Sequence, residues 1–262
     1  MLFQRQVSVV GIDFDGTVTR ASNGKTSTYA SSVLGASYRF ADLELETKIP
    51  FLVFAVDEGN SGAPLVAGNV ELGASYVKTA HDYEMKIGAL FTLPTAPATT
   101  EVFFGFPGEA VVVHRDYLDE ASWSRGWDRA WLWSSHAFTP FAPSFRIGSR
   151  RDAVFQHATE LVAAPLITFD PGSSTIPFIV QLSEDLGARL DVLRMGLRAE
   201  VAGNLTSPAR AQLSLLPYAG VDTGSFFGDV GALFNTQDPV AMGASVDGQV
   251  SWALRLRAGG RF

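Results

Sequence analysis

The last thirteen residues of the chain alternate between apolar and polar side chains. Apolar or small side chains occupy every second position and belong to Val250, Trp252, Leu254, Leu256, Ala258, Gly260 and Phe262. The positions between them include Arg255, Arg257 and Arg261. Because successive side chains of a strand point to opposite faces, this segment is predicted to be a β-strand with one apolar and one cationic face. A transmembrane barrel needs such strands, since lipid-facing and lumen-facing residues alternate along each of them.

Similar alternation marks the first hundred residues. It predicts strands over about 7–18, over a segment ending at 40, and over 43–53, 72–76 and 83–93. In the third of these, Glu44, Glu46 and Lys48 share the face opposite the apolar stripe. Charges on one face of so apolar a strand need water, or each other, on that side. This pattern is typical of the wall of a water-filled lumen.

The sequence Leu-Gly-Ala-Ser-Tyr occurs twice, at 34–38 and at 72–76. Each copy is followed, after a short link, by an alternating segment. A period of about 38 residues also fits a propeller blade or a solenoid repeat. Since only two copies are visible, we interpret them as similar hairpins of one barrel.

The second half of the chain shows fainter alternation. We expect strands near 130–138, 145–169, 176–190, 191–205, 209–221 and 225–234, before the final one. Leucines from Leu182 to Leu197 also fit a helical stripe, but the tight link at 189–191 favours a hairpin. The expected strands number twelve, and an even number suits a single-chain barrel whose two ends lie on one side of the membrane. The predicted fold is therefore all-β, a closed antiparallel transmembrane barrel.

A long connection interrupts the pattern between about 94 and 129. Barrels of this type carry long loops on the outer side and short turns on the periplasmic side. Asp119 could cap a short helix that places Trp123, Trp127 and Trp131 on one face, at a spacing of four. The three rings either pack the loop onto the rim of the barrel or form a lid over its mouth.

Composition narrows the class of protein further. A chain of 262 residues with 47% hydrophobic and 18% charged residues is apolar-rich, yet no apolar run approaches the ~18 residues of a membrane helix. The net charge of −7 argues against a nucleic-acid partner. The absence of cysteine excludes disulfides and thiolate chemistry. We expect residues 1–262 to form one domain.

The terminal strand resembles the C-terminal strand of Gram-negative outer-membrane β-barrels, whose final Phe is recognised by the barrel-assembly machinery. The residues that would form this assembly signal are Trp252, Leu254, Leu256 and Phe262. The resemblance implies a protein of the bacterial outer membrane, in contact with lipid and lipopolysaccharide. Met1–Gln6 lack the basic region and apolar core of a signal peptide, so we expect export with the signal already removed.

A second resemblance points elsewhere. Asp13-Phe14-Asp15-Gly16-Thr17 resembles the first motif of haloacid-dehalogenase-like phosphatases, which implies Asp13 as nucleophile and Asp15 as general acid/base beside Mg²⁺. That family also requires a helix after the motif and a later pair of acids. Residues 20–38 alternate instead, and Gly228-Asp229 is followed by no second acid. The phosphatase is kept as a remote alternative.

The barrel interpretation assigns a set of residues to the lumen wall: Asp13, Asp15, Glu44, Glu46, Lys48, Glu71, Glu84, Lys86, Arg194, Arg198, Arg255 and Arg257. These charges form either a salt-bridge network that fills the lumen or a transverse field across a pore. The four histidines are scattered without metal-ligand spacing, so we expect no catalytic residue, metal or cofactor. The expected function is passive transport of small solutes through a narrow channel. A non-conducting scaffold that binds an envelope or extracellular partner is the alternative.

Overall fold

The structure is a computed structural model. It describes residues 7–20, 26–57, 60–62, 66–96, 129–133, 137–150, 153–168, 176–206, 211–235 and 252–262.

Within these residues the chain is almost entirely β-strand. Twelve long strands form the barrel: β1 (Val7–Arg20), β2 (Thr26–Phe40), β3 (Leu43–Asp57), β6 (Val70–Ala80), β7 (Tyr83–Leu93), β9 (Ala142–Ser149), β10 (Phe155–Pro165), β12 (Phe178–Leu190), β13 (Leu193–Asn204), β14 (Ala211–Asp222), β15 (Phe226–Asn235) and β16 (Trp252–Arg261). The short elements are β4 (Asn60–Gly62), β5 (Val66–Ala67), the 3₁₀ turn η1 (Ala130–Leu132), β8 (Ala137–Phe138) and β11 (Ile167–Thr168).

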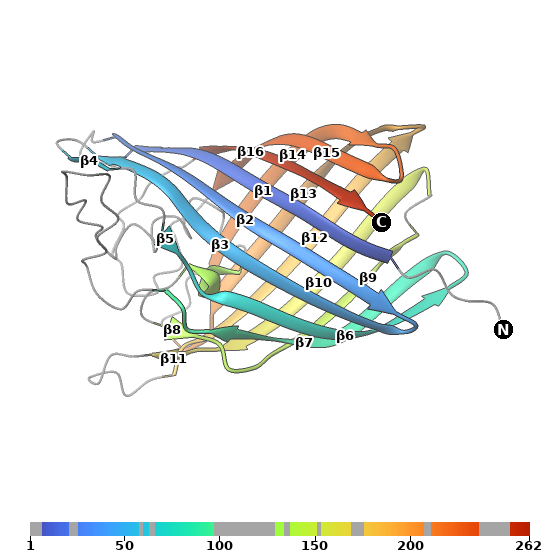
Figure 1. Cartoon of the computed structure of the whole chain (residues 1–262), viewed down its shortest axis with the longest axis horizontal. Coiled ribbons are helices and arrows are strands. Elements are labelled where there is room, and N and C mark those ends of the chain that lie inside the picture. Colours follow the sequence, from blue (N-terminus) through green and yellow to red (C-terminus); the bar gives the residue numbers. More distant parts are fainter. Residues whose placement is uncertain are drawn as a thin grey trace.

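The strands pair in chain order, and the barrel closes where β16 pairs with β1. Every one of these pairings is antiparallel, and the strands run obliquely round a single barrel (Figure 1). Closure gives each of the twelve long strands a paired neighbour on both sides, and an unpaired strand edge would not be tolerated in lipid. The predicted fold class is thus confirmed, including the number of barrel strands. No helix among the described residues is long and apolar enough to cross a membrane.

Tight turns gather at one end of the barrel. Two-residue links join β2 to β3, β6 to β7 and β12 to β13. Each link begins with a residue of positive φ, at Ala41 (53°), His81 (20°) and Asp191 (57°). Such left-handed residues match the twist of two-residue hairpins. Phe262, at the end of β16, lies at the same end of the barrel as these turns (Figure 1).

The outer face of the barrel carries the apolar stripes that the alternation predicts. Side chains expected to face lipid are between 42% and 51% exposed at Leu45, Ile87, Leu197, Leu254 and Leu256. Phe51 is less exposed, and the Phe14 side chain lies outside the described residues. An exposed apolar belt of this extent needs a lipid environment.

Two of the strands expected from the sequence are wrong. The described parts of 130–138 form η1 and β8 instead of one strand, and those of 145–169 form β9, β10 and β11 instead of one. In the first segment Trp131, Leu132, Trp133 and Ala137 are apolar because they are buried inside the barrel, not because they alternate. The second contains a turn in which the Ala153 backbone N–H donates to the Arg150 carbonyl (3.1 Å). The first error adds a barrel strand that is not there, and the second merges the barrel strands β9 and β10 into one. The two errors cancel, so the predicted number of barrel strands is still twelve.

The phosphatase alternative is also wrong. Asp13 and Asp15 lie within β1, which continues to Arg20 and pairs along its length with β2 and β16. A doubly wound enzyme needs parallel strands covered by helices. The described residues instead form antiparallel strands and one 3₁₀ turn.

Candidate solute pathway through the barrel

The lumen contains a segment of chain that blocks part of its cross-section. Residues 129–133 (the plug segment) belong to the connection between β7 and β9, and they lie in the lumen, surrounded by the barrel strands. Trp131 and Trp133 are fully buried, as is nearly all of Leu132. They pack with the inward apolar side chains of six barrel strands and neighbouring residues: Leu52, Leu90, Ala137, Ala142, Val162, Ala164, Leu166, Ile179 and Ala202.

Arg129 fixes the plug segment to the wall through carboxylates from three strands. Its guanidinium forms an ion pair with Glu71, another with Glu160 (Nη2–Oε1, 2.8 Å) and a longer one with Glu46 (3.5 Å). The Trp131 indole N–H donates to the second carboxylate oxygen of Glu71 (2.9 Å). Glu71 is completely buried, so its charge depends on these donors and on Lys48, 3.4 Å away. Arg129 has a positive φ of 52°, unusual for a bulky residue and held here by the surrounding contacts.

Two hydrogen bonds from Asn69 dock the same segment against the residues just before β6. The Asn69 backbone N–H donates to the Leu132 carbonyl (2.7 Å), and its side-chain amide donates to the Trp131 carbonyl (2.9 Å). At Gly68 an added Cβ would lie 2.3 Å from the Leu132 oxygen, so a larger residue could not stand there. The plug segment is therefore held in a fixed position in the lumen by polar and apolar contacts together.

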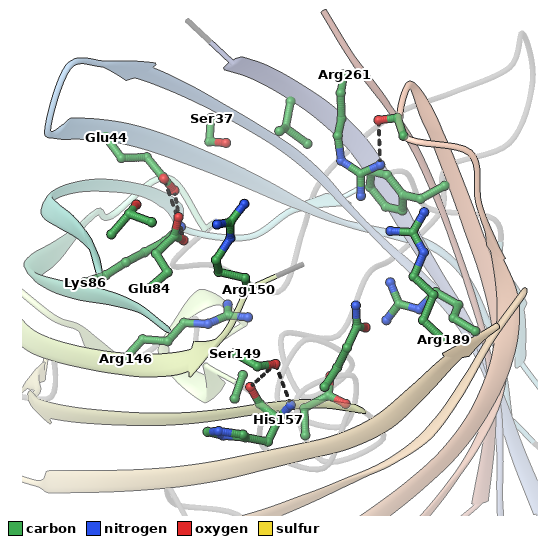
Figure 2. A pocket seen from close by; sticks show the side chains of 18 of the residues that line it. Ser37, Glu44, Glu84, Lys86, Arg146, Ser149, Arg150, His157, Arg189 and Arg261 are labelled. Atoms are coloured by element: carbon green, nitrogen blue, oxygen red, sulfur yellow. Dashed lines mark hydrogen bonds and ion pairs between the residues drawn. The ribbon is translucent and has the colours of Figure 1, made fainter. Parts of the chain in front are cut away.

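Toward the end with the tight turns, the lumen opens into a cavity of about 880 Å³ (the vestibule). Of its described lining residues, three are acidic, namely Glu44, Glu84 and Asp185. Eight are cationic: Arg39, Lys86, Arg146, Arg150, Arg189, Arg194, Arg257 and Arg261. Figure 2 shows the labelled arginines reaching into this space from opposite sides of the barrel.

On the wall formed by β2, β3, β6 and β7, the vestibule charges are paired. Lys86 binds both carboxylate oxygens of Glu44 at 2.8 Å (Figure 2). Arg39 binds Glu84 at 2.8 Å. Arg39 also donates to the Thr79 hydroxyl (3.3 Å). These side chains are partly exposed, so each pair contributes little to stability and mainly sets the local charge.

The opposite wall, from β12 to β16, carries most of the arginines. Arg257 binds Asp229 (2.7 Å), and Arg261 binds Asp222 (3.1 Å) while its guanidinium lies over the Phe227 ring at 4.3 Å. Deeper in the lumen Arg198 pairs with Glu200 (3.1 Å). The acidic partners come from the same wall, so these ion pairs form within each side of the barrel and not across it. Among the described side chains around the vestibule, cations outnumber acids by eight to five, even with Asp222 and Asp229 included.

A second and much smaller cavity, of about 20 Å³, adjoins the vestibule, with Asp185, Tyr218 and Arg257 lining both. Its other lining residues are Arg198, Leu216, Asp229 and Arg255. A volume of this size holds about one water molecule. The described lumen thus contains a wide charged vestibule and, in a separate region, the buried plug segment.

The sequence-predicted lumen residues are placed as follows. Glu44, Glu84, Lys86, Arg194 and Arg257 line the vestibule, and Arg198 and Arg255 line the small cavity. Glu46, Lys48 and Glu71 surround the plug segment. The register of β1 sets Asp13 opposite Arg257 and Asp15 opposite Arg255, but the two aspartate side chains lie outside the described residues.

Several residues of the pathway were not identified from the sequence. Asp185 and Arg189 share the parity opposite to the apolar face of their strand, so the alternation could have revealed them. Arg129 offered no such signal, because it lies outside the strands and its partners are distant in sequence. Trp131 was expected on a helix face with Trp123 and Trp127; it lies in η1, and the other two are outside the described residues.

Comparisons with known proteins agree on the fold. No family model matches the chain, and no curated protein matches it. The COG4313 outer membrane channel from Pseudomonas putida F1 is similar in structure, with a TM-score of 0.59 and 14% identity over 100% of this chain and 97% of that one. A structure of the KdgM porin has a TM-score of 0.50 and 11% identity, covering 96% of this chain and 99% of its own.

These likenesses extend over nearly the whole of each chain. Together with the closed antiparallel barrel, the apolar outer belt and the charged interior, they define the class: the chain has the fold of outer-membrane β-barrel proteins. The solved structures named above are a channel and a porin, not enzymes.

Proposed function

We propose that this protein is an integral protein of the bacterial outer membrane that provides a narrow passive channel for small hydrophilic solutes. The observation that carries the proposal is the vestibule, a charged cavity of about 880 Å³ inside a barrel whose outer face is apolar. Burying so many charges without water would be prohibitive. A water-filled entrance to a pathway is the arrangement that they fit.

The orientation follows from the lengths of the connections. Short turns lie on the periplasmic side of outer-membrane barrels and long loops on the outer side. The vestibule would then open to the periplasm, and the plug segment would restrict the lumen on the side of the long connection. Solutes would move along their concentration gradients, without cofactor or catalysis. The channel and the porin of similar fold support this function.

A second function has one observation in its favour. The plug segment is held by Arg129 and by two fully buried tryptophans, which is a strong closure for a pore. If the closure is complete, the barrel would serve as a scaffold or anchor whose long connection binds an envelope or extracellular partner.

Planar-bilayer recording of the refolded protein separates the two functions. The channel proposal expects discrete conductance steps of small amplitude, since the plug segment and the side chains packed on it fill part of the described lumen. A bilayer that incorporates the protein and stays silent over a wide voltage range would favour the scaffold.

We also propose that the terminal strand is the signal for the barrel-assembly machinery. Leu254 and Leu256 face outward on β16, and Phe262 is 83% exposed beyond the strand. Phe262→Asp should therefore reduce the amount of protein in the outer membrane while leaving the barrel, refolded in detergent, intact. Normal levels of this variant in outer-membrane fractions would contradict the proposal.

A further inference from the structure

We propose that solutes pass the plug segment along the wall formed by β14, β15 and β16, and that Gln212 lies on their route. This inference rests on the proposed channel and goes beyond it, because it names the side of the lumen along which solutes move. The contacts of the plug segment, the place of the small cavity and a buried amide carry the proposal in turn.

The contacts of the plug segment come from the wall that runs from β2 round to β13. Its apolar side chains pack with inward residues of β3, β7, β9, β10, β12 and β13, and Val33 of β2 packs against the same cluster. Leu216, Leu233 and Ala253, from β14, β15 and β16, form a cluster of their own. A passage between the two clusters could therefore open without breaking the ion pairs of Arg129.

The small cavity leads from the vestibule onto this second wall. Tyr218 lines both cavities, and Leu216, two residues before it on β14, lines the small one. The next residues on the same face of β14 are Ser214 and Gln212, since alternate side chains of a strand point to one face. Successive inward side chains of β14 thus lead from the vestibule, past the small cavity, to Gln212.

Gln212 lies at the level of the plug segment. The register of β13 and β14 sets it opposite Ala202, which packs in the plug cluster. The register of β12 and β13 sets Ala202 opposite Gln181, whose side-chain oxygen accepts from the Arg129 backbone N–H (2.9 Å). A single strand spacing therefore separates a residue packed with the plug segment from the residue that we place on the route.

The amide of Gln212 is buried without a partner. Its side chain is completely buried, and neither its nitrogen nor its oxygen has a hydrogen-bond partner among the described residues. At the next inward position the Ser214 hydroxyl donates to the Asn235 side-chain oxygen (2.8 Å). An unpaired buried amide destabilises a fold, and water or a polar solute beside it would remove that cost. A hydrated route along β14 gives Gln212 this partner.

Cysteine modification during planar-bilayer recording tests the route. The chain contains no cysteine, so an introduced thiol reacts without background. The reagent is sulfonatoethyl methanethiosulfonate, which forms a disulfide with an accessible thiol and leaves an anionic group there. Gln212→Cys and Leu216→Cys place the thiol on the proposed route. Ala202→Cys is the matched control, because Ala202 lies opposite Gln212 and is as deeply buried, but within the plug cluster.

We expect the reagent to lower the current through Gln212→Cys and Leu216→Cys roughly twofold or more, since the added group narrows the passage and changes its charge. The currents through the wild type and Ala202→Cys should stay unchanged. Because two variants lie on the route, the test still holds if one of them does not fold.

Equal block of Ala202→Cys and the route variants would overturn the proposal, because solutes would then reach the plug cluster as well. Conducting route variants that the reagent leaves unchanged would overturn it too, and would mean that Gln212 meets at most a trapped water. A silent wild type would contradict the channel itself and the route with it. Either of the first two results in a conducting protein contradicts the route alone, so the two failures are distinguishable.

Discussion

The plug anchor and the vestibule wall use the same side chain in opposite ways. At the plug anchor, Arg129 meets Glu46, Glu71 and Glu160 within a site closed by two tryptophans. At the vestibule wall, arginines outnumber acids, and they lie along a cavity large enough for water and solute. Arg129 joins two parts of the protein, whereas the vestibule arginines, several of them also ion-paired, line a space that solutes can enter.

The difference shows what burial does to an ion pair. In a closed site, each unpaired charge carries a large desolvation penalty, so the plug anchor surrounds its arginine with carboxylates. In a hydrated cavity the penalty is small, and surplus charge can be kept for recognition at little cost in stability. We infer that the plug restricts the flow of solutes, whereas the vestibule decides which of them enter.

The largest effect is expected from removing the plug anchor. In Arg129→Ala/Trp131→Ala the segment loses its ion pairs and the indole that fills the lumen, so single-channel conductance should rise several-fold. The matched control is Arg146→Ala, which removes a half-exposed arginine 3.9 Å from the same Glu160 and should change conductance little. Equal conductance of wild type and double variant would locate the constriction elsewhere.

The next largest difference is expected in the free energy of unfolding, between a variant at the plug anchor and a variant at the vestibule wall. Glu71→Gln removes a fully buried carboxylate that binds Arg129, and we expect it to lower the free energy of unfolding by about 2 kcal/mol. Glu84→Gln removes a carboxylate that binds Arg39 at the partly exposed wall, and it should cost less than about 1 kcal/mol. Urea unfolding of both variants in lipid vesicles measures the difference. Equal losses would mean that the plug anchor is as hydrated as the vestibule.

The smallest effect is expected at Tyr218, whose ring lies 5.0 Å from the Arg194 guanidinium carbon. Tyr218→Phe keeps the ring and loses only the hydrogen bond to Asp185, so the reversal potential in a KCl gradient should stay close to that of the wild type. Tyr218→Ala removes the ring and should weaken the preference for chloride slightly in the same measurement. If the two variants behave alike, the ring does not position Arg194.

The fold was accessible from the sequence because lipid and lumen impose opposite demands on alternate positions. The strand from Tyr83 to Leu93 was predicted with its observed bounds, since Tyr83, Ile87 and Phe91 face outward while Glu84 and Lys86 face inward. The same reasoning misread 130–138, where apolar residues lie inside the barrel and their surroundings impose no alternation.

The plug anchor could not be predicted from the sequence in this way. Arg129 and its partners Glu46, Glu71 and Glu160 are 31 to 83 positions apart, so no local pattern links them. Only the closure of the barrel brings their strands around one point. The arginines on the vestibule wall from β12 to β16 could be predicted only in part. Arg194 was assigned to the lumen from the alternation of its strand, but its position opposite Arg189 depends on the register of the hairpin.

The reversal potential across a bilayer with a KCl gradient tests most directly whether restriction and selection lie in different regions. We expect the wild type and Arg129→Ala/Trp131→Ala to show the same preference for chloride over potassium, although their conductances differ, because the vestibule arginines are present in both. A wild type that prefers potassium, or a double variant that loses the preference for chloride, would contradict the account.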